Sequence, residues 1–295
     1  MDLQIVVSSV ALAFVFMWVQ SLYWAMPYRV WATSALIIGL TTATVMNFIV
    51  SWAPGLGMIF QILIEGALIV IIAGAALMMY FFRDPERVPP EEDGAILSPA
   101  DGKVIYVKKV EGESHFVSIK AGTRYPLEEL LQTQWPFRGG HLIGIEMNVL
   151  DVHVNRAPIA GRITLCKKVK GGFPGLGKQN AEIRSERAVI LIDAGNASVG
   201  VVQIASRFVR RIVSYVKEGQ QVALGERIGM IRFGSQVDLA IPDSVDYEIA
   251  VEPGQVVRAG LTVLARYIEG ISSQTKNAGQ AIRRHSLTRG QEDDF

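Results

Sequence analysis

The first 82 residues of the chain are almost without charge, and this constrains the fold more than any other feature. Only Asp2, Arg29 and Glu65 carry charged side chains there. Each of three apolar stretches has the roughly 20 residues that a bilayer-spanning helix needs. They cover residues 3–24, 30–52 and 56–82. The sequence therefore predicts a membrane anchor over residues 1–82, made of two to three transmembrane helices.

Basic residues around these stretches predict the orientation. Arg29 follows the first stretch, and Arg83 and Arg87 follow the third, whereas the N-terminus and the second junction have neither Lys nor Arg. Cytoplasmic loops carry an excess of Lys and Arg. We therefore expect a cell (inner) membrane protein whose remaining chain lies on the cytoplasmic side. Glu65, inside the third stretch, is either a functional polar contact or an acid that faces a neighbouring helix.

Past Arg83 the charge content becomes ordinary, and short Val- and Ile-rich runs alternate with Gly, Pro, Asp and Asn. The pattern predicts one short helix at 127–132 and many strands, among them 95–97, 102–110, 227–233, 238–241 and 257–264. A mainly β body, folded as a barrel or sandwich, is expected over residues 83–265. Residues 266–295 lack this pattern and predict a flexible polar tail.

The body contains an internal repeat. Residues 216–228 and 251–263 share the form V-x-x-G-x-x-V-x-x-G-x-x followed by a β-branched residue. This form predicts a tight turn, a short strand, a second glycine turn and another strand. It resembles the hammerhead turns of biotinyl and lipoyl carrier domains. The modified lysine that such domains carry between their halves has no counterpart here, and the region of Gly234 and Ser235 takes its place.

Charge and cysteine content exclude some functions. The net charge is +1, whereas a nucleic-acid-binding surface would make the chain strongly basic, so no nucleic-acid partner is expected. Cys166 is alone, which excludes an intramolecular disulfide and a multi-cysteine metal cluster. No bound metal is expected.

Ser235 is the strongest candidate nucleophile. It follows Gly234 at a break between two predicted strands. A serine hydroxyl attacks once a base takes its proton or strain exposes a carbonyl. The glycine permits unusual backbone angles and removes the Cβ that would hinder the approach. An ordinary Gly-Ser turn is the alternative when the pair is taken alone.

Four segments together resemble the phosphatidylserine decarboxylase family, in its short prokaryotic, pyruvoyl-dependent form. They are Phe-Phe-Arg83-Asp-Pro-Glu-Arg87, Ser98-Pro-Ala-Asp101-Gly102, Asp151-Val-His153-Val-Asn-Arg156-Ala-Pro158 and Arg232-Phe-Gly234-Ser235. Asn180-Ala181, followed by Ser185-Glu-Arg187, is similar too. The resemblance covers about residues 80–265. The anchor is longer than that of the short form, and the tail is extra.

The resemblance implies a proenzyme that cuts itself between Gly234 and Ser235. The products would be a β chain of residues 1–234 and an α chain of residues 235–295. Ser235 would become a covalent pyruvoyl group, the only cofactor expected. That group would form a Schiff base with the amine of phosphatidylserine and release CO2, giving phosphatidylethanolamine in phospholipid biosynthesis. The implied partners are the lipid substrate, the membrane and the two chains, and a homo-oligomer is compatible with the sequence.

The resemblance also assigns roles to Asp101 and His153. Asp101 would be a carboxylate near the serine that orients a base during processing, although Asp-Gly is also a common turn pair. Larger relatives carry two histidines three residues apart, one implicated in cleavage and one in decarboxylation. Alignment on Pro158 puts His153 at the first position and Arg156 at the second. Either His153 serves both roles, or processing uses Asp101 and strain.

Two other functions are compatible with parts of the sequence. A membrane-anchored hammerhead module that binds a partner without catalysis would account for the repeat and the anchor, but not for the Gly-Ser pair. A pyruvoyl decarboxylase for another amine-bearing substrate, such as a soluble amino acid, would account for the pair. The anchor argues against the soluble substrate.

Overall fold

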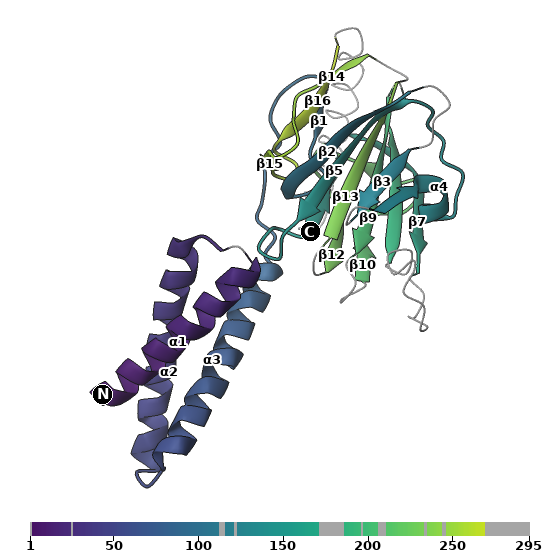
Figure 1. The fold of residues 1–295 in the computed structure, drawn as a ribbon. Helices are drawn as coiled ribbons and strands as arrows, with labels where there is room; N and C mark the ends of the chain where they lie inside the picture. The colour runs from purple at the N-terminus through teal and green to yellow at the C-terminus, as the bar shows by residue number, and fades with distance from the viewer. Residues whose placement is uncertain are drawn as a thin grey trace, which may run out of the picture. The chain divides into compact units, whose positions relative to one another are not determined.

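The computed structural model describes residues 2–24, 26–111, 116–120, 123–170, 186–195, 197–205, 211–232, 235–243 and 246–268. The chain divides into two compact units, Met1–Arg83 and Asp84–Phe295. The first unit is helical, and the second is built mainly from antiparallel strands, which curl into a half-barrel (Figure 1). The expected fold class, a mainly β body preceded by apolar helices, is confirmed.

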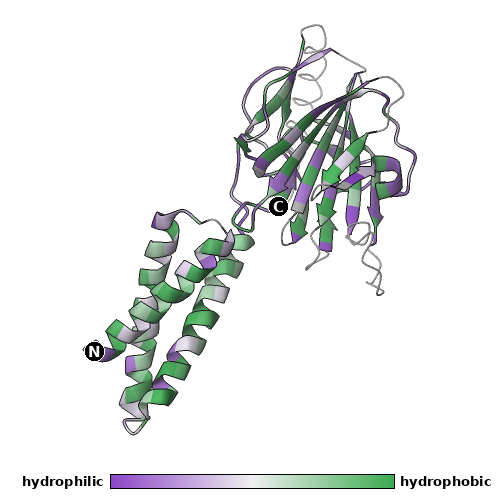
Figure 2. Cartoon of the chain, viewed as in Figure 1, coloured by the Kyte–Doolittle hydropathy of each residue, from purple (hydrophilic) through white to green (hydrophobic). Residues whose placement is uncertain are grey.

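The first unit consists of α1 (Leu3–Trp24), α2 (Tyr28–Trp52) and α3 (Met58–Phe81). All three are long and apolar enough to cross a membrane. Hydrophobic residues dominate all three helices (Figure 2). The three predicted apolar helices are therefore confirmed, with ends that differ from the predicted ones by at most two residues.

Small residues bring α1 and α2 close together. A Cβ atom added to Gly39 would lie only 2.7 Å from the Cα atom of Val10, while Ala13 and Ala35 are fully buried. Small side chains let helix backbones approach in this way within membranes. Glu65 of α3 is buried, and the Ser8 hydroxyl of α1 lies within hydrogen-bonding distance of its carboxyl group, at 2.9 Å. Glu65 thus faces a neighbouring helix.

The second unit is a set of antiparallel strands with one short helix, α4 (Leu127–Leu131). Its strands are β1 (Ala95–Leu97), β2 (Gly102–Val110), β3 (Val117–Lys120), β4 (Thr123–Pro126), β5 (Gly140–Met147), β6 (Val154–Arg156), β7 (Gly161–Val169), β8 (Arg187–Asp193), β9 (Ser198–Ala205), β10 (Arg211–Ser214), β11 (Gln221–Val222), β12 (Arg227–Arg232), β13 (Ser235–Pro242), β14 (Tyr247–Ile249), β15 (Val256–Val257) and β16 (Val263–Tyr267).

Eight of these strands form the main sheet, in the order β11-β7-β8-β9-β13-β5-β2-β15. Two three-stranded sheets, β1-β16-β14 and β10-β12-β6, contribute to the apolar core on one of its faces, which includes Val237 and Leu239. The hairpin β3-β4 and helix α4 contribute to a second core on the other face, which includes Ala240. Successive residues of β13 therefore alternate between two cores, as the pleat of a strand requires.

The predicted repeat is present as two hammerhead-like turns. Each contains two glycines in the left-handed region of backbone conformation, which favours glycine. Their φ angles are +85° at Gly219, +74° at Gly225, +99° at Gly254 and +70° at Gly260. Each repeat gives a two-residue strand, β11 or β15, followed by a second turn and a longer strand. β11 and β15 are the two edge strands of the main sheet.

The two repeats bind to equivalent places in the body. The Gly219 amide donates to Ile163 and the Gly254 amide donates to Val104, both over 2.7 Å. Ile163 and Val104 occupy the same position in two similar segments, Ala-Pro-Ile-Ala-Gly-Arg-Ile163 and Ser-Pro-Ala-Asp-Gly-Lys-Val104. The order of the main sheet reads the same way from both ends under this correspondence, with β11 matching β15, β7 matching β2, β8 matching β5 and β9 matching β13. The body is thus two similar halves related by an approximate two-fold axis between β9 and β13.

The two halves exchange backbone hydrogen bonds where they meet. The Leu97 amide donates to the Pro158 carbonyl over 2.9 Å, and the Arg156 amide donates to the Pro99 carbonyl over 3.0 Å. This reciprocal pair joins the motif around Asp101 to the motif around His153. Segments far apart in the sequence are therefore held together by the fold itself.

Two predicted strands have different limits in the structure. The single strand predicted at 257–264 is wrong, because the chain turns at Gly260, where φ is +70°, and divides into β15 and β16. The strand predicted at 238–241 begins earlier, at Ser235. β16 continues to Tyr267, and the rest of the predicted tail, from residue 269 on, lies outside the described residues.

Candidate active site

The Gly-Ser pair lies at a connection between two sheets. β12 ends at Arg232 in a three-stranded sheet, and β13 begins at Ser235 in the main sheet. Gly234 and Phe233 lie outside the described residues. The backbone of Ser235 is paired on both sides, with Met147 of β5 and Ala205 of β9. Both ends of this connection are therefore anchored in separate sheets.

Backbone pairing brings His153 to the same end of the main sheet. Met147, the partner of Ser235, is the last residue of β5, and the chain then turns and reaches His153 six residues later. The Ile231 amide donates to the His153 carbonyl over 3.1 Å. Ile231 lies near the end of β12, just before the Gly-Ser connection. His153 is thus fixed beside the strand that leads into that connection.

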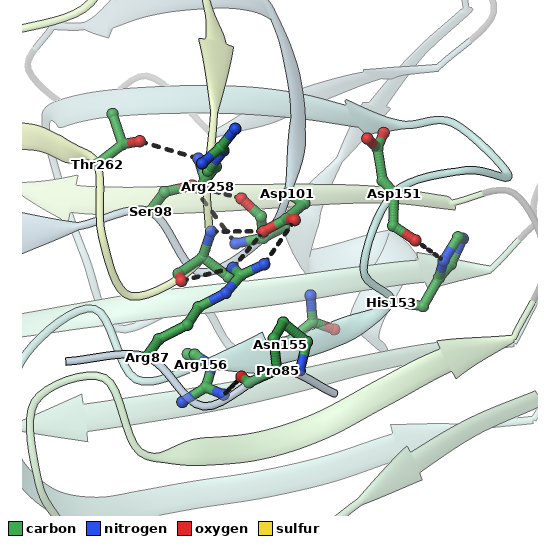
Figure 3. A network of polar contacts seen from close by, with 12 residues as sticks. Pro85, Arg87, Ser98, Asp101, Asp151, His153, Asn155, Arg156, Arg258 and Thr262 are labelled. Atoms are coloured by element: carbon green, nitrogen blue, oxygen red, sulfur yellow. Dashed lines mark hydrogen bonds and ion pairs between the residues drawn. The ribbon is translucent and has the colours of Figure 1, made fainter. Parts of the chain in front are cut away.

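A hydrogen bond of the His153 ring to the Asp151 carbonyl indicates the tautomer of His153. The side chain is fully buried, and its Nδ1 atom lies 2.9 Å from the Asp151 carbonyl. A carbonyl only accepts, so Nδ1 must carry the proton. In the neutral ring the lone pair is then on Nε2, which can accept a proton. Figure 3 shows the ring held against Asp151 in this way.

A turn that sequence reasoning did not assign to the site holds the Asp151 carbonyl. The Asn148 amide donates to the Asp151 carboxylate over 2.7 Å, and the Asp151 amide donates to the Asn148 carbonyl over 2.9 Å. Asn and Asp side chains stabilise turns in this manner. The Asn-x-x-Asp spacing before His153 is the sequence signal that indicates it.

Asp101 is held by an arginine from the start of the body. Arg87 binds it with two nitrogens, over 2.5 and 2.8 Å, and the Ala259 amide donates to the same carboxylate over 2.7 Å (Figure 3). Both side chains are largely buried. A bidentate, buried pair of this kind has strong directional preference. None of the hydrogen bonds described for Asp101 goes to His153.

The backbone of Asp101 is nevertheless close to the site. Lys103 of β2 and Gln236 of β13 are both paired with Glu146 of β5, so β2 and β13 flank the same strand. Strands two apart in a sheet are separated by about 10 Å. Asp101 and Ser235 therefore lie at the same end of the main sheet, on either side of β5.

Arg156 is the residue that the resemblance aligns with the second histidine of larger relatives, and the two terminal nitrogens of its guanidinium bond groups of the body. It donates to the Gly225 carbonyl over 3.0 Å, to the Pro85 carbonyl over 3.0 Å and to the Asp84 carboxylate over 3.2 Å. Asp84 also accepts from Arg227. These bonds give Arg156 a structural role.

Asp84, Pro85, Glu86 and Arg87 together form a segment that we call the exit strap. At one end it binds Arg156 and Arg227 in the half that carries His153. At the other end Arg87 binds Asp101 in the other half. The exit strap therefore joins the two halves at their junction, and it is the first segment of the body after the anchor.

Asn155 connects the strand of His153 to the main sheet. Its amide nitrogen donates to the Pro99 carbonyl over 3.2 Å, and its amide oxygen accepts from Gln203 of β9 over 2.7 Å. Both amide side chains are fully buried.

Within the described residues no group of three His, Cys, Asp or Glu side chains is arranged to hold a metal ion.

Known proteins of similar sequence indicate the family of this chain. The family model described as phosphatidylserine decarboxylase matches residues 75–265. A protein of Methanothermobacter thermautotrophicus, provisionally named archaetidylserine decarboxylase proenzyme, is 41% identical over 202 residues, which are 68% of this chain and 86% of that protein. The phosphatidylserine decarboxylase proenzyme of Symbiobacterium thermophilum is 38% identical over 210 residues, 70% and 87% of the two chains. That of Azorhizobium caulinodans is 41% identical over 187 residues, 63% and 72% of the two chains.

Proposed function

This chain belongs to the phosphatidylserine decarboxylase family, and we propose that it is a proenzyme that cuts itself between Gly234 and Ser235 and then decarboxylates a serine-headgroup phospholipid. The observation that carries the proposal is the position of this Gly-Ser pair. The bond between Gly234 and Ser235 lies directly before β13, within the matched residues, where cleavage would divide no strand. The products would be a β chain, 1–234, and an α chain, 235–295.

The first reaction uses the chain's own atoms. The Ser235 hydroxyl attacks the Gly234 carbonyl, and the C–N bond breaks, so that an ester and a free amine replace the amide. Loss of the Cα proton and of the Cβ–O bond then frees the Gly234 carboxylate. One water molecule replaces the nitrogen, ammonia leaves, and a pyruvoyl group remains. Overall, one water is consumed and one ammonia is released.

The described residues are compatible with a pyruvoyl group at the start of β13. That strand is interior and paired on both sides from Ser235 on, so a new chain end there would stay anchored. Such a group supplies a carbonyl that condenses with an amine and accepts the electrons released as CO2 departs. The protein's own task is to hold that carbonyl and the lipid amine together and to move protons.

We assign the proton transfers of both reactions to His153. Its support is the Nδ1 contact with the Asp151 carbonyl, which leaves Nε2 as the atom that can exchange a proton, and the bond that ties its backbone to the strand before the Gly-Ser pair. Because Arg156 is engaged by the exit strap and Gly225, a single histidine would serve the two roles. Asp101, engaged by Arg87, is proposed as a positioning residue and not as a base.

A lipid substrate fits the anchor, since a headgroup amine lies at the membrane surface. The names of the relatives agree on a serine headgroup and differ in the lipid, phosphatidylserine or archaetidylserine. The body is proposed to be at the cytoplasmic face of the cell membrane. With Arg87 paired inside the body, that orientation depends on Arg29 and Arg83.

The proposal is tested by CO2 release from carboxyl-labelled phosphatidylserine and archaetidylserine in vesicles that contain the full chain. Release from either lipid, lost in Ser235→Ala, is the expected result, and the ratio of the two rates defines the lipid preference. If the parent chain releases CO2 from neither lipid, the proposed decarboxylation is wrong. Free serine is a useful third substrate, because release from it alone would point to a soluble amino acid.

A further inference from the structure

The second core contains a group of buried polar side chains that the proposed chemistry does not use. Gln236 and Asp238 of β13, Tyr106 of β2 and Ser118 of β3 lie among the apolar side chains of the face covered by β3-β4 and α4. Ser118 and Asp238 are fully buried, and Gln236 is 3% exposed. Burying polar groups is costly unless they bond one another. Apolar side chains could fill this part of the core at lower cost, so these polar residues need another explanation.

The four side chains bond one another. The Gln236 amide nitrogen lies 2.7 Å from the Asp238 carboxylate, 3.1 Å from the Tyr106 hydroxyl and 3.4 Å from the Ser118 hydroxyl. The Tyr106 hydroxyl also bonds Asp238 and accepts from the Ile119 amide. Burial, and then the charge of Asp238, raise the pKa of Tyr106 far above its ordinary value, so the phenol stays a donor.

A glycine in the intervening strand makes this arrangement possible. Tyr106 is in β2 and Gln236 is in β13, with β5 between them. A Cβ atom added to Gly144 of β5 would lie 2.4 Å from the Tyr106 ring. The ring thus passes across β5 at Gly144, and its hydroxyl reaches the far strand. Gly144 is paired with Asp238 itself, so the crossing occurs at the level of the polar group.

The place of this group in the chain indicates its use. On the proposed function, from which this inference follows, Gln236 is the second residue of the α chain and Asp238 the fourth. Cleavage turns a continuous connection into a strand end, and strand ends open locally more easily than strand interiors. Any opening there would move the reacting carbonyl away from His153 and the lipid.

We propose that Gln236, Asp238 and Tyr106 are positioning residues that hold the new end of β13 in place after cleavage. Backbone pairing with β5 and β9 fixes the register of that end. On the core side, side-chain bonds hold Gln236 and Asp238 to Tyr106 of β2, and Gln236 also to Ser118 of β3. Before cleavage the connection to β12 restrains the same residues, so the group matters mainly in the cut protein.

The test uses Gln236→Leu and the milder Tyr106→Phe in the full chain in detergent or vesicles. Val189→Ala is the matched control, since it removes buried atoms from the same core, on a different strand. Hydrogen exchange of peptides from residues 235–242 is measured together with the extent of cleavage and with kcat and KM. Each change is also made in the uncut Ser235→Ala background.

The inference predicts near-parental cleavage, at least tenfold faster exchange at the start of β13 and at least a tenfold lower kcat with little change in KM. In the uncut background, exchange should stay within about twofold of the Ser235→Ala chain. Exchange and kcat equal to those of Val189→Ala would overturn the inference while the proposed function stands. Equal acceleration of exchange in cut and uncut chains would reduce the group to ordinary core stabilisation and overturn it too. A parent chain that never cuts would remove both proposals together.

Discussion

At the residue scale, both proposed reactions depend most on the Nε2 atom of His153. Replacing His153 by Ala should lower CO2 release at least a hundredfold, because a positioned general base contributes about 10²–10⁴ to a rate. Self-cleavage should slow as well if one histidine serves both reactions. The measurement is CO2 release and the ratio of cut to uncut chain over time.

His141→Gln is the control for that experiment. His141 is half-buried and bonds Tyr247 away from the Gly-Ser connection, so this variant should keep both activities within a few-fold. Full decarboxylation by the His153→Ala protein would remove His153 from the site.

The Arg87–Asp101 pair allows a prediction about stability. Arg87→Ala leaves a buried carboxylate without its main partner, which typically costs about 3–5 kcal/mol. For a body of this size the thermal midpoint should fall by roughly 10 °C, at about 2–4 °C per kcal/mol. Light scattering or intrinsic fluorescence on heating in detergent measures the shift.

The double variant Arg87→Met with Asp101→Leu separates structure from chemistry. It should recover most of the lost thermal midpoint, since an apolar pair can replace a buried ion pair. Because Asp101 is proposed to position the site, cleavage should stay slow at normal stability. Cleavage at the parental rate in this double variant would show that Asp101 only supports the fold.

Single residues show where sequence reasoning succeeds and where it stops. Ser235 and His153 belong to local motifs, so the chain alone identifies them as candidates. The partner of Asp101 is not part of its motif, because Arg87 lies 14 residues earlier and also bonds the Ala259 carbonyl, from the far end of the body's sequence. The same holds for Arg156 and Asp84, which are 72 residues apart. The absence of a second histidine is readable from sequence, but the use made of Arg156 is not.

At the element scale, the exit strap couples the start of the body to the strand that carries His153. Asp84→Ala removes an acceptor shared by Arg156 and Arg227, and leaves the buried Arg156 with fewer partners. Because β6 carries both Arg156 and the end of the His153 loop, self-cleavage should slow several-fold. A pulse-chase experiment that follows the uncut chain on a gel measures this.

Glu86→Gln is the matched control in the same strap. Glu86 is exposed and binds only the partly exposed Arg227 among its described contacts. Exposed ion pairs contribute about 0–1 kcal/mol. Cleavage at the parental rate in both variants would mean that the strap has no effect on the site.

Elements also differ in how well their patterns predict them. The apolar helices are readable because an unbroken apolar run of this length has one stable form in a bilayer. The hammerhead turns are readable because their glycines recur at fixed spacing and adopt left-handed angles. Short strands such as β6 and β14 are not, since three residues carry too little pattern. Their existence depends on pairing with distant strands.

At the scale of the whole molecule, the body is expected to lie on the cytoplasmic side of the membrane. Protease added to inside-out vesicles should degrade residues after Arg83, whereas protease added outside intact spheroplasts should not. We expect Arg29 and Arg83 to set this orientation, so Arg29→Glu together with Arg83→Glu should give a mixed population. Degradation from the outside in the parent chain would show that the body faces the other way.

The central claim is that one chain becomes two at a defined bond and gains a carbonyl there, and intact mass spectrometry of the purified membrane protein tests it most directly. The account predicts two chains, residues 1–234 and the 61 residues 235–295, the smaller one blocked to N-terminal sequencing. Ser235→Ala should give a single chain of 295 residues. An uncut full-length parent chain in preparations that release CO2 from the lipid would contradict the account.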